Sequence, residues 1–137
     1  MPSLVARELS GPGRGLVSGA FDGGKLRAIV EVFTCAGDAA GAYPVGAPLP
    51  AGAMPLFGCV MTSAALGSAT LALGTAQAPA RYRAAAALAA EVPAFFVSAA
   101  NAAAPLAAPE QLVLSVAGAA LPASGRIVVV MVYVDNS

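Results

Sequence analysis

The stretch that closes the sequence, Arg126 to Val134 (RIVVVMVYV), restricts the fold more than any other part of the chain. Side chains of a β-strand alternate between the two faces of a sheet, and here both alternating sets are apolar. One set is Ile127, Val129, Met131 and Tyr133, and the other is Val128, Val130, Val132 and Val134. In an antiparallel sandwich only one face of each sheet meets the core. We therefore expect the second face to be covered by a helix or by another copy of the protein.

Other stretches of the sequence also have the pattern of short β-strands. They are KLRAIVEVFT (25–34), LFGCVMTSA (56–64), GSATLALGT (67–75) and EQLVLSVAG (110–118). In the first of them Leu26, Ala28, Val30 and Val32 share one face. The turn Ala65–Gly67 suggests a hairpin, and the glycine- and proline-rich segment 35–55 is expected to be a loop. The segment 94–109 is expected to be extended or loop, with Phe95, Phe96 and Val97 buried.

The segment 79–91 (PARYRAAAALAAE) predicts one short helix. Pro79 stands where helices often begin, Pro93 lies just beyond the expected end, and alanine is the best helix former. Isolated helices of this length are marginal, so we expect tertiary packing to hold it. Together with the strands, this predicts an all-β chain, an antiparallel β-sandwich or jelly-roll-like domain with one short helix.

The chain divides into an irregular N-terminal arm, residues 1–24, and a single sandwich domain, residues 25–137. Six glycines, two prolines and the run Asp22-Gly23-Gly24 interrupt any regular pattern before residue 25. Two interpretations of the arm stay open: a frayed end, or a segment that becomes ordered only against a neighbour.

The charge content bears on possible partners. Seven basic and seven acidic residues cancel, and charged residues are only 10% of the chain, so we expect no specific nucleic-acid binding. So few charges cannot cover the surface of a monomer, which points to burial in lipid or against other subunits. Five prolines between residues 39 and 80 exclude a membrane-spanning helix there, and residues 1–15 lack the apolar core of a signal peptide. Burial against protein is the better interpretation.

The sequence offers no catalytic or cofactor-binding motif. It contains no histidine, its only lysine is Lys25, and its carboxylates are scattered, so we expect no enzymatic activity, no metal and no cofactor. Cys35 and Cys59 are the only cysteines, and two apolar thiols in the core are favoured over a disulfide. The tripeptide Arg81-Tyr82-Arg83 could stack on nucleic acid, but solvated or subunit-pairing arginines are the preferred interpretation.

The segment from Gly46 to the C-terminus resembles small structural proteins of tailed bacteriophages. The similar features are an LPAGA segment before an apolar strand (49–53), the SATLALG strand (68–74), the Arg81-Tyr82 pair and the closing apolar strand with Tyr133. The resemblance implies a non-enzymatic head decoration, or cement, protein. Such a protein binds the major capsid protein as a homo-oligomer, with a trimer favoured, and lies on the capsid surface of the virion after synthesis in the bacterial cytoplasm.

The residues expected to carry this role are interface residues. They lie in the arm, in the proline-rich segment Val45–Met54 and in the arginine pair: Leu4, Val5, Leu16, Val17, Val45, Leu49, Met54, Arg81 and Arg83. Two alternatives remain: a head-fibre base, neck or tail component, and a carbohydrate-binding β module. The second would need exposed aromatic platforms, and the chain has three tyrosines and no tryptophan.

Overall fold

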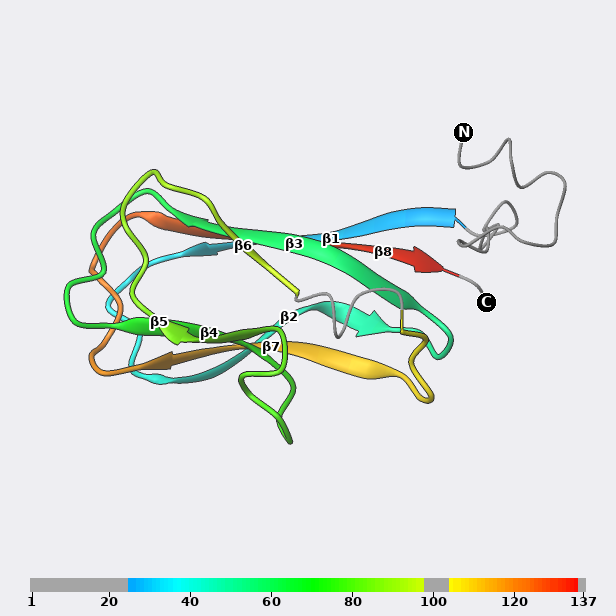
Figure 1. Cartoon of the computed structure of the whole chain (residues 1–137). Coiled ribbons are helices and arrows are strands. Elements are labelled where there is room, and N and C mark those ends of the chain that lie inside the picture. Colours follow the sequence, from blue (N-terminus) through cyan, green and yellow to red (C-terminus); the bar gives the residue numbers. More distant parts are fainter. Residues whose placement is uncertain (1–24, 98–103, 136–137) are drawn as a thin grey trace, which may run out of the picture.

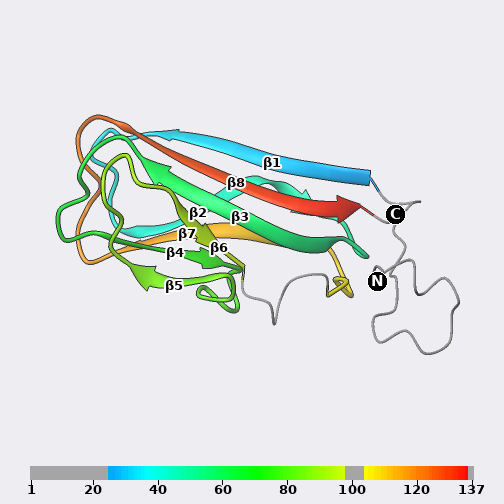
Figure 2. The same ribbon diagram turned by 45° about the horizontal axis from the view of Figure 1, so that its top comes forward.

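The computed structural model describes residues 25–97 and 104–135, which form eight β-strands (Figure 1). The strands are β1 (Lys25–Thr34), β2 (Gly41–Leu49), β3 (Met54–Thr62), β4 (Thr70–Gly74), β5 (Arg83–Ala86), β6 (Ala94–Phe96), β7 (Glu110–Ala117) and β8 (Arg126–Asp135). These strands form two four-stranded sheets that lie one over the other (Figures 1 and 2). No helix occurs among the described residues, and so none that could cross a membrane.

The strand order defines a jelly roll. Sheet A has the order β1-β8-β3-β6 and sheet B the order β2-β7-β4-β5, and every pairing within them is antiparallel. The chain passes from one sheet to the other at every connection except β4–β5. This arrangement is that of a long hairpin, with its tip at β4–β5, rolled into two Greek keys. The predicted fold class, an antiparallel sandwich of jelly-roll type, is confirmed.

The core lies between the two sheets and follows the alternation of the sequence. Leu71 and Leu73 of β4 and Leu112 and Leu114 of β7 fill it from sheet B, all with no exposed surface. From sheet A the buried set includes Ile127, Val129 and Met131, again fully buried. Each of these strands thus presents every second side chain to the core.

The predicted helix at 79–91 is wrong. Residues 83–86 form β5, which pairs with β4 through Leu71↔Ala86 and Leu73↔Arg83. Tyr82 and Leu88 are both buried in the core. On a helix of 3.6 residues per turn, a spacing of six residues would place these two side chains about 120° apart, whereas the extended chain, with a register shift inside β5, buries both. Because alanine offers little apolar surface to anchor a helix, pairing with β4 and burial of these two anchors prevail.

Two further expectations for the connections are also wrong. The segment 35–55 contains β2, an edge strand of sheet B, where Pro44 and Pro48 are tolerated. The register of β2 against β7 breaks between Val45 and Leu49. The turn at Ala65–Gly67 does not close a hairpin, because β3 belongs to sheet A and β4 to sheet B. It carries the chain from one sheet to the other.

Candidate interaction surfaces

The outward face of sheet A is apolar over all four strands, and we call it the apolar face. Its side chains come from β1, β8, β3 and β6: Leu26, Ala28, Val30, Val32, Val128, Val130, Val132, Phe57, Cys59, Met61 and Phe95. The strand register aligns them in rows, and the central row runs Val30, Val130, Cys59, Phe95. Leu26 is 69% exposed, Val30 61% and Phe95 71%. Phe57 and Met61 of β3 are 50% and 37% exposed, so large hydrophobic side chains are exposed at both edges of the sheet and on an inner strand, which marks an interaction surface.

Charge is nearly absent from the apolar face. Among the outward positions of its four strands, the only charged side chain is that of Arg126, at the beginning of β8. Arg27 and Glu31 of β1 have the opposite parity. The Arg27 guanidinium pairs with Asp135 at 3.1 Å, and a Glu31 carboxylate oxygen accepts the Gly46 N–H at 3.0 Å. A partner bound to this face would therefore make apolar contacts rather than ion pairs.

The outward face of sheet B is different in composition. Ala42 of β2, Ser115 of β7 and Ala72 of β4 form one of its rows, so small and weakly polar side chains stand where sheet A has valine and phenylalanine. The connection after β4 also packs against this strand end, where Gly74 lies against the backbone of Ala78 and Pro79. The two outer faces of the sandwich thus have different chemistry.

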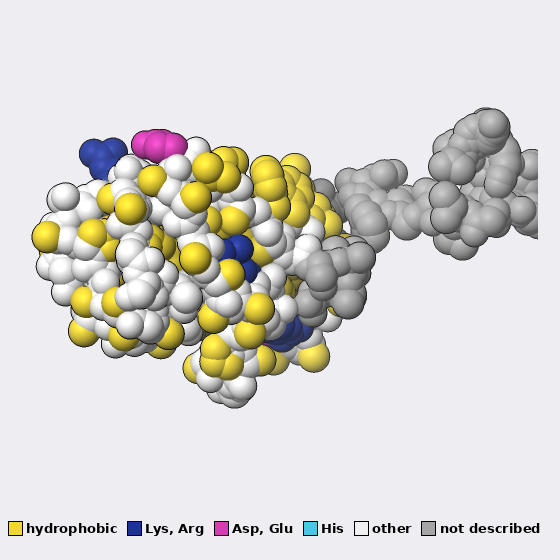
Figure 3. All heavy atoms as spheres, turned by 60° about the vertical axis from the view of Figure 1, so that its left-hand side comes forward, with side chains coloured by type: hydrophobic (Ala, Val, Ile, Leu, Met, Phe, Trp, Pro, Cys, Tyr) yellow, Lys and Arg dark blue, Asp and Glu magenta, His cyan; other side chains and the backbone are white. Residues whose placement is uncertain are grey.

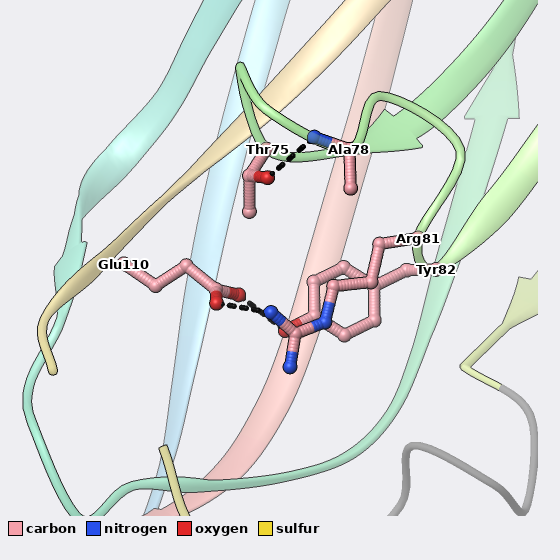
Figure 4. A network of polar contacts seen from close by, with 5 residues as sticks. All are labelled: Thr75, Ala78, Arg81, Tyr82 and Glu110. Carbon is pink, nitrogen blue, oxygen red and sulfur yellow. Dashed lines mark hydrogen bonds and ion pairs between the residues drawn. The ribbon is translucent and has the colours of Figure 1, made fainter. Parts of the chain in front are cut away.

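A polar cluster ties the β4–β5 connection to the start of β7 (Figure 4). The Arg81 guanidinium pairs with one Glu110 oxygen at 2.5 Å, and the Tyr82 hydroxyl donates to the other at 2.5 Å. Burial is the main reason that the pKa of the Tyr82 hydroxyl is raised. The hydrogen bond to Glu110 and the negative charge of Glu110 raise this pKa further. Thr75 Oγ1 accepts the Ala78 N–H at 3.0 Å and closes the turn between them. The cluster fixes the connection that was predicted to be helical.

A hollow of about 750 Å³ lies beside this cluster, between the segments 75–81 and 105–113. Its only ionisable lining groups are Arg81 and Glu110, which pair with each other. The described residues contain no cluster of histidine, cysteine, aspartate and glutamate side chains that could hold a metal. Among the described residues that line the hollow, therefore, there is neither a base beside a nucleophile nor a pair of acids.

The interface residues predicted from the sequence fall into three groups. Leu4, Val5, Leu16 and Val17 lie outside the described residues. Val45 and Leu49 have no exposed surface and Met54 only 3%, so their side chains lie in the interior of the described fold.

The arginine pair is placed differently. Arg81 keeps 35% of its side chain exposed while paired with Glu110. In Arg83, Nη2 donates to the Ala87 carbonyl at 3.3 Å, whereas Nε is buried and has no hydrogen-bond partner among the described residues. The structure therefore leaves Arg81 available at the surface and holds Arg83 along β5.

The apolar face was only partly visible in the sequence. Its β8 residues were singled out as an apolar set that needs a cover, and the shared face of Leu26, Ala28, Val30 and Val32 was recognised. Phe57, Met61 and Phe95 were missed, and Phe95 was expected to be buried but is 71% exposed. Alternation shows which residues share a face, but it does not show which face meets the core.

The cysteines are free, as expected. Cys35 is buried, and burial followed by the nearby Asp38 charge raises the pKa of its thiol. Cys59 is half-buried and lies on the apolar face rather than in the core.

Comparison with known proteins identifies the fold at the level of solved structures. No protein-family model and no curated protein sequence matches the chain. A chain of the cyanophage Pam1 capsid asymmetric unit matches with a TM-score of 0.65 and 22% identity, over 87% of this chain and 91% of that one. A chain of the acid-stable capsid of Helicobacter pylori bacteriophage KHP30 matches with a TM-score of 0.64 and 13% identity, over 82% and 89%.

A chain of the Ralstonia phage GP4 capsid is also similar, with a TM-score of 0.63 and 19% identity, over 82% of this chain and 86% of that one. The coverage is nearly equal on both sides in all three comparisons, so the matched chains are themselves small proteins of about this length. The chain therefore shares its jelly-roll fold with small chains found in phage capsids.

Proposed function

We propose that this chain is a structural, non-enzymatic component of the virion of a tailed phage or phage-like particle. More specifically, we propose a decoration protein that binds the major capsid protein on the capsid surface. The observation that carries the proposal is the similarity to chains from three different phage capsids, each over more than four fifths of this chain. The matches also cover 86 to 91% of the capsid chains themselves, so those chains are small, which favours an accessory component.

The physical character of the surface supports the same role. A decoration protein stabilises a shell by burying apolar surface against it, and repetition over many copies multiplies a modest local affinity. This chain has 10% charged residues and a face of exposed valine, leucine and phenylalanine. Such a surface suits permanent burial in an assembly. We include in the proposal that the protein is a homo-oligomer, with a trimer favoured.

The alternative of a carbohydrate-binding module gains nothing from the positions of the tyrosines. Tyr82 is buried, and Tyr43 and Tyr133 are both partly buried. Among the described residues, the exposed aromatic side chains are Phe57 and Phe95, and both belong to the apolar face. The described surface therefore does not favour a carbohydrate-binding function.

The test is the composition and stability of purified heads. We expect the chain in purified heads at a copy number proportional to that of the major capsid protein, and we expect heads made without it to open at a lower temperature. A copy number matching a single ring per particle would instead place it in the neck or tail. Heads that lack the chain altogether would overturn the proposal.

A further inference from the structure

The apolar face is too hydrophobic to remain in water. A typical monomer exposes its large hydrophobic side chains singly, whereas here they fill adjacent rows on four paired strands. The outward face of sheet B differs in composition, because one of its rows pairs Ala42 with Ser115, whereas the central row of sheet A is Val30, Val130, Cys59 and Phe95. Figure 3 shows the wider context, a surface on which hydrophobic side chains are common and charged ones few. The apolar face must be buried in the working protein.

The chemistry of the face limits what can cover it. With Arg126 as its one charged outward side chain, at one end, the face offers no ion pair and no row of hydrogen-bond donors to a polar partner. The same face of a second copy is equally apolar and nearly uncharged, so the two faces match in chemical character. From the exposed fractions we estimate on the order of 700 Å² available per copy, near the 800 Å² or so per partner of a standard specific interface.

The availability of the partner leads to the same conclusion. A capsid surface exists only after a shell has assembled, whereas an exposed hydrophobic sheet would aggregate from the moment the chain folds. Other copies of the chain are present from the beginning. We infer that the apolar face is buried against the apolar face of neighbouring copies, around the symmetry axis of a homo-oligomer.

The inference rests on the proposed homo-oligomer and does not depend on capsid binding. Stacked sheets pack about 10 Å apart, which one layer of interdigitating valine and phenylalanine side chains fills. Cys59 lies in the central row of the face, on β3, one of the two inner strands of sheet A. An axis through the middle of the face therefore brings the Cys59 thiols of neighbouring copies close together.

The first experiment measures the mass of the purified full-length chain in solution. We expect the wild type to be an oligomer of at least two copies. We expect Val30→Glu to dissociate into the 13.3 kDa monomer. Ala42→Glu is the matched control, because Ala42 is also an exposed outward residue of an edge strand, but in sheet B. It should keep the oligomer. A monomeric wild type, or an oligomer that survives Val30→Glu unchanged, would overturn the inference.

The second experiment uses the wild-type thiols and does not require a folded variant. Cys35 is 3% exposed, so Cys59 is the thiol that a native monomer would offer to a maleimide. We expect Cys59 to be protected in the oligomer, and a bismaleimide with an arm of about 10 Å to join two chains through it. Protection of Cys59 in a monomer would show that the same chain covers the face. Reactive Cys59 in free protein that becomes protected only on heads would show that capsid protein covers it. Either result would overturn the inference.

Discussion

Gly58 shows how closely sheet A is packed at a single residue. A Cβ at this position would lie 2.2 Å from Phe96 Cζ and 2.5 Å from the carbonyl oxygen of Val130. The first neighbour is a ring buried in the core and the second is backbone of β8, so an added Cβ would displace the ring from its core position and disturb the pairing of β3 with β8. We expect Gly58→Ala to destabilise the fold by about 3 kcal/mol in urea unfolding, as overpacking a tight site does.

Gly41 provides the matched control for that substitution. It also lies in a β-strand and has an ordinary strand backbone, but nothing lies within 4 Å of an added Cβ. We expect Gly41→Ala to be neutral or to stabilise by about 0.5 kcal/mol, through the reduced entropy of the unfolded chain. Equal losses for the two variants would show that steric overlap at Gly58 is not the cause.

A second prediction at the residue scale concerns the hydroxyl of Tyr82. Tyr82→Phe removes the hydrogen bond to Glu110, and we expect a loss of about 1 to 2 kcal/mol at neutral pH. Because the folded state raises the pKa of this hydroxyl above its usual 10.0, the advantage of the wild type is fully present below pH 10.

That advantage should shrink above pH 10, where the unfolded chain loses the proton and the folded chain keeps it. Calorimetric melting of the wild type and Tyr82→Phe at pH 8 and at pH 11 measures the change. A stability difference that stays constant between the two pH values would contradict the role assigned to this proton.

At the scale of the element, β5 is a case in which tertiary interactions override the local helix propensity of the sequence. The alanine-rich sequence favours a helix, yet Arg83–Ala86 is a strand because β4 offers an unpaired edge and both Tyr82 and Leu88 are buried. The substitution Ala85→Thr distinguishes the two states by the sign of its effect. On an exposed strand position threonine should be neutral or stabilise by up to about 0.5 kcal/mol, whereas in a helix it would destabilise by a similar amount.

Thermal unfolding of Ala85→Thr beside Ala85→Gly makes the comparison, because glycine weakens a strand and a helix alike. Destabilisation by both substitutions would indicate that the segment is a helix. Stabilisation by threonine alone agrees with the strand.

How much of the fold the sequence predicts differs from element to element. Alternation located β1, β4 and β7 because large apolar residues recur in them with a period of two, whereas β3 and β8 were located as short apolar runs. β2 escaped notice because its glycines and prolines indicate a loop, and only its position at the sheet edge makes Pro44 acceptable. Propensity depends on the local sequence alone. An edge strand, by contrast, is stabilised by its hydrogen bonds to the neighbouring strand, which the local sequence does not show.

The whole molecule adds what no single element can specify. The sequence marks Val128, Val130 and Val132 as needing a cover, but only the topology places them in one surface with Val30 of β1 and Phe95 of β6. These strands lie far apart along the chain and become neighbours because the long hairpin is rolled. The topology thus brings the residues of the candidate surface together, and the sequences of the individual strands make that surface apolar.

Neutral overall charge sets how the assembled protein should respond to salt. Seven basic and seven acidic residues cancel, and the described ion pairs, Arg27–Asp135 and Arg81–Glu110, lie within the chain. In 1 M salt the screening length falls to about 3 Å, which would release a partner held by charge, whereas sulfate strengthens the burial of apolar surface. We expect heads that carry the chain to retain it through sedimentation in 1 M NaCl and in 1 M ammonium sulfate. Release in NaCl would show that charged contacts hold the protein to the shell, and the capsid-facing surface would then have to include charged side chains outside the apolar face, such as Arg81.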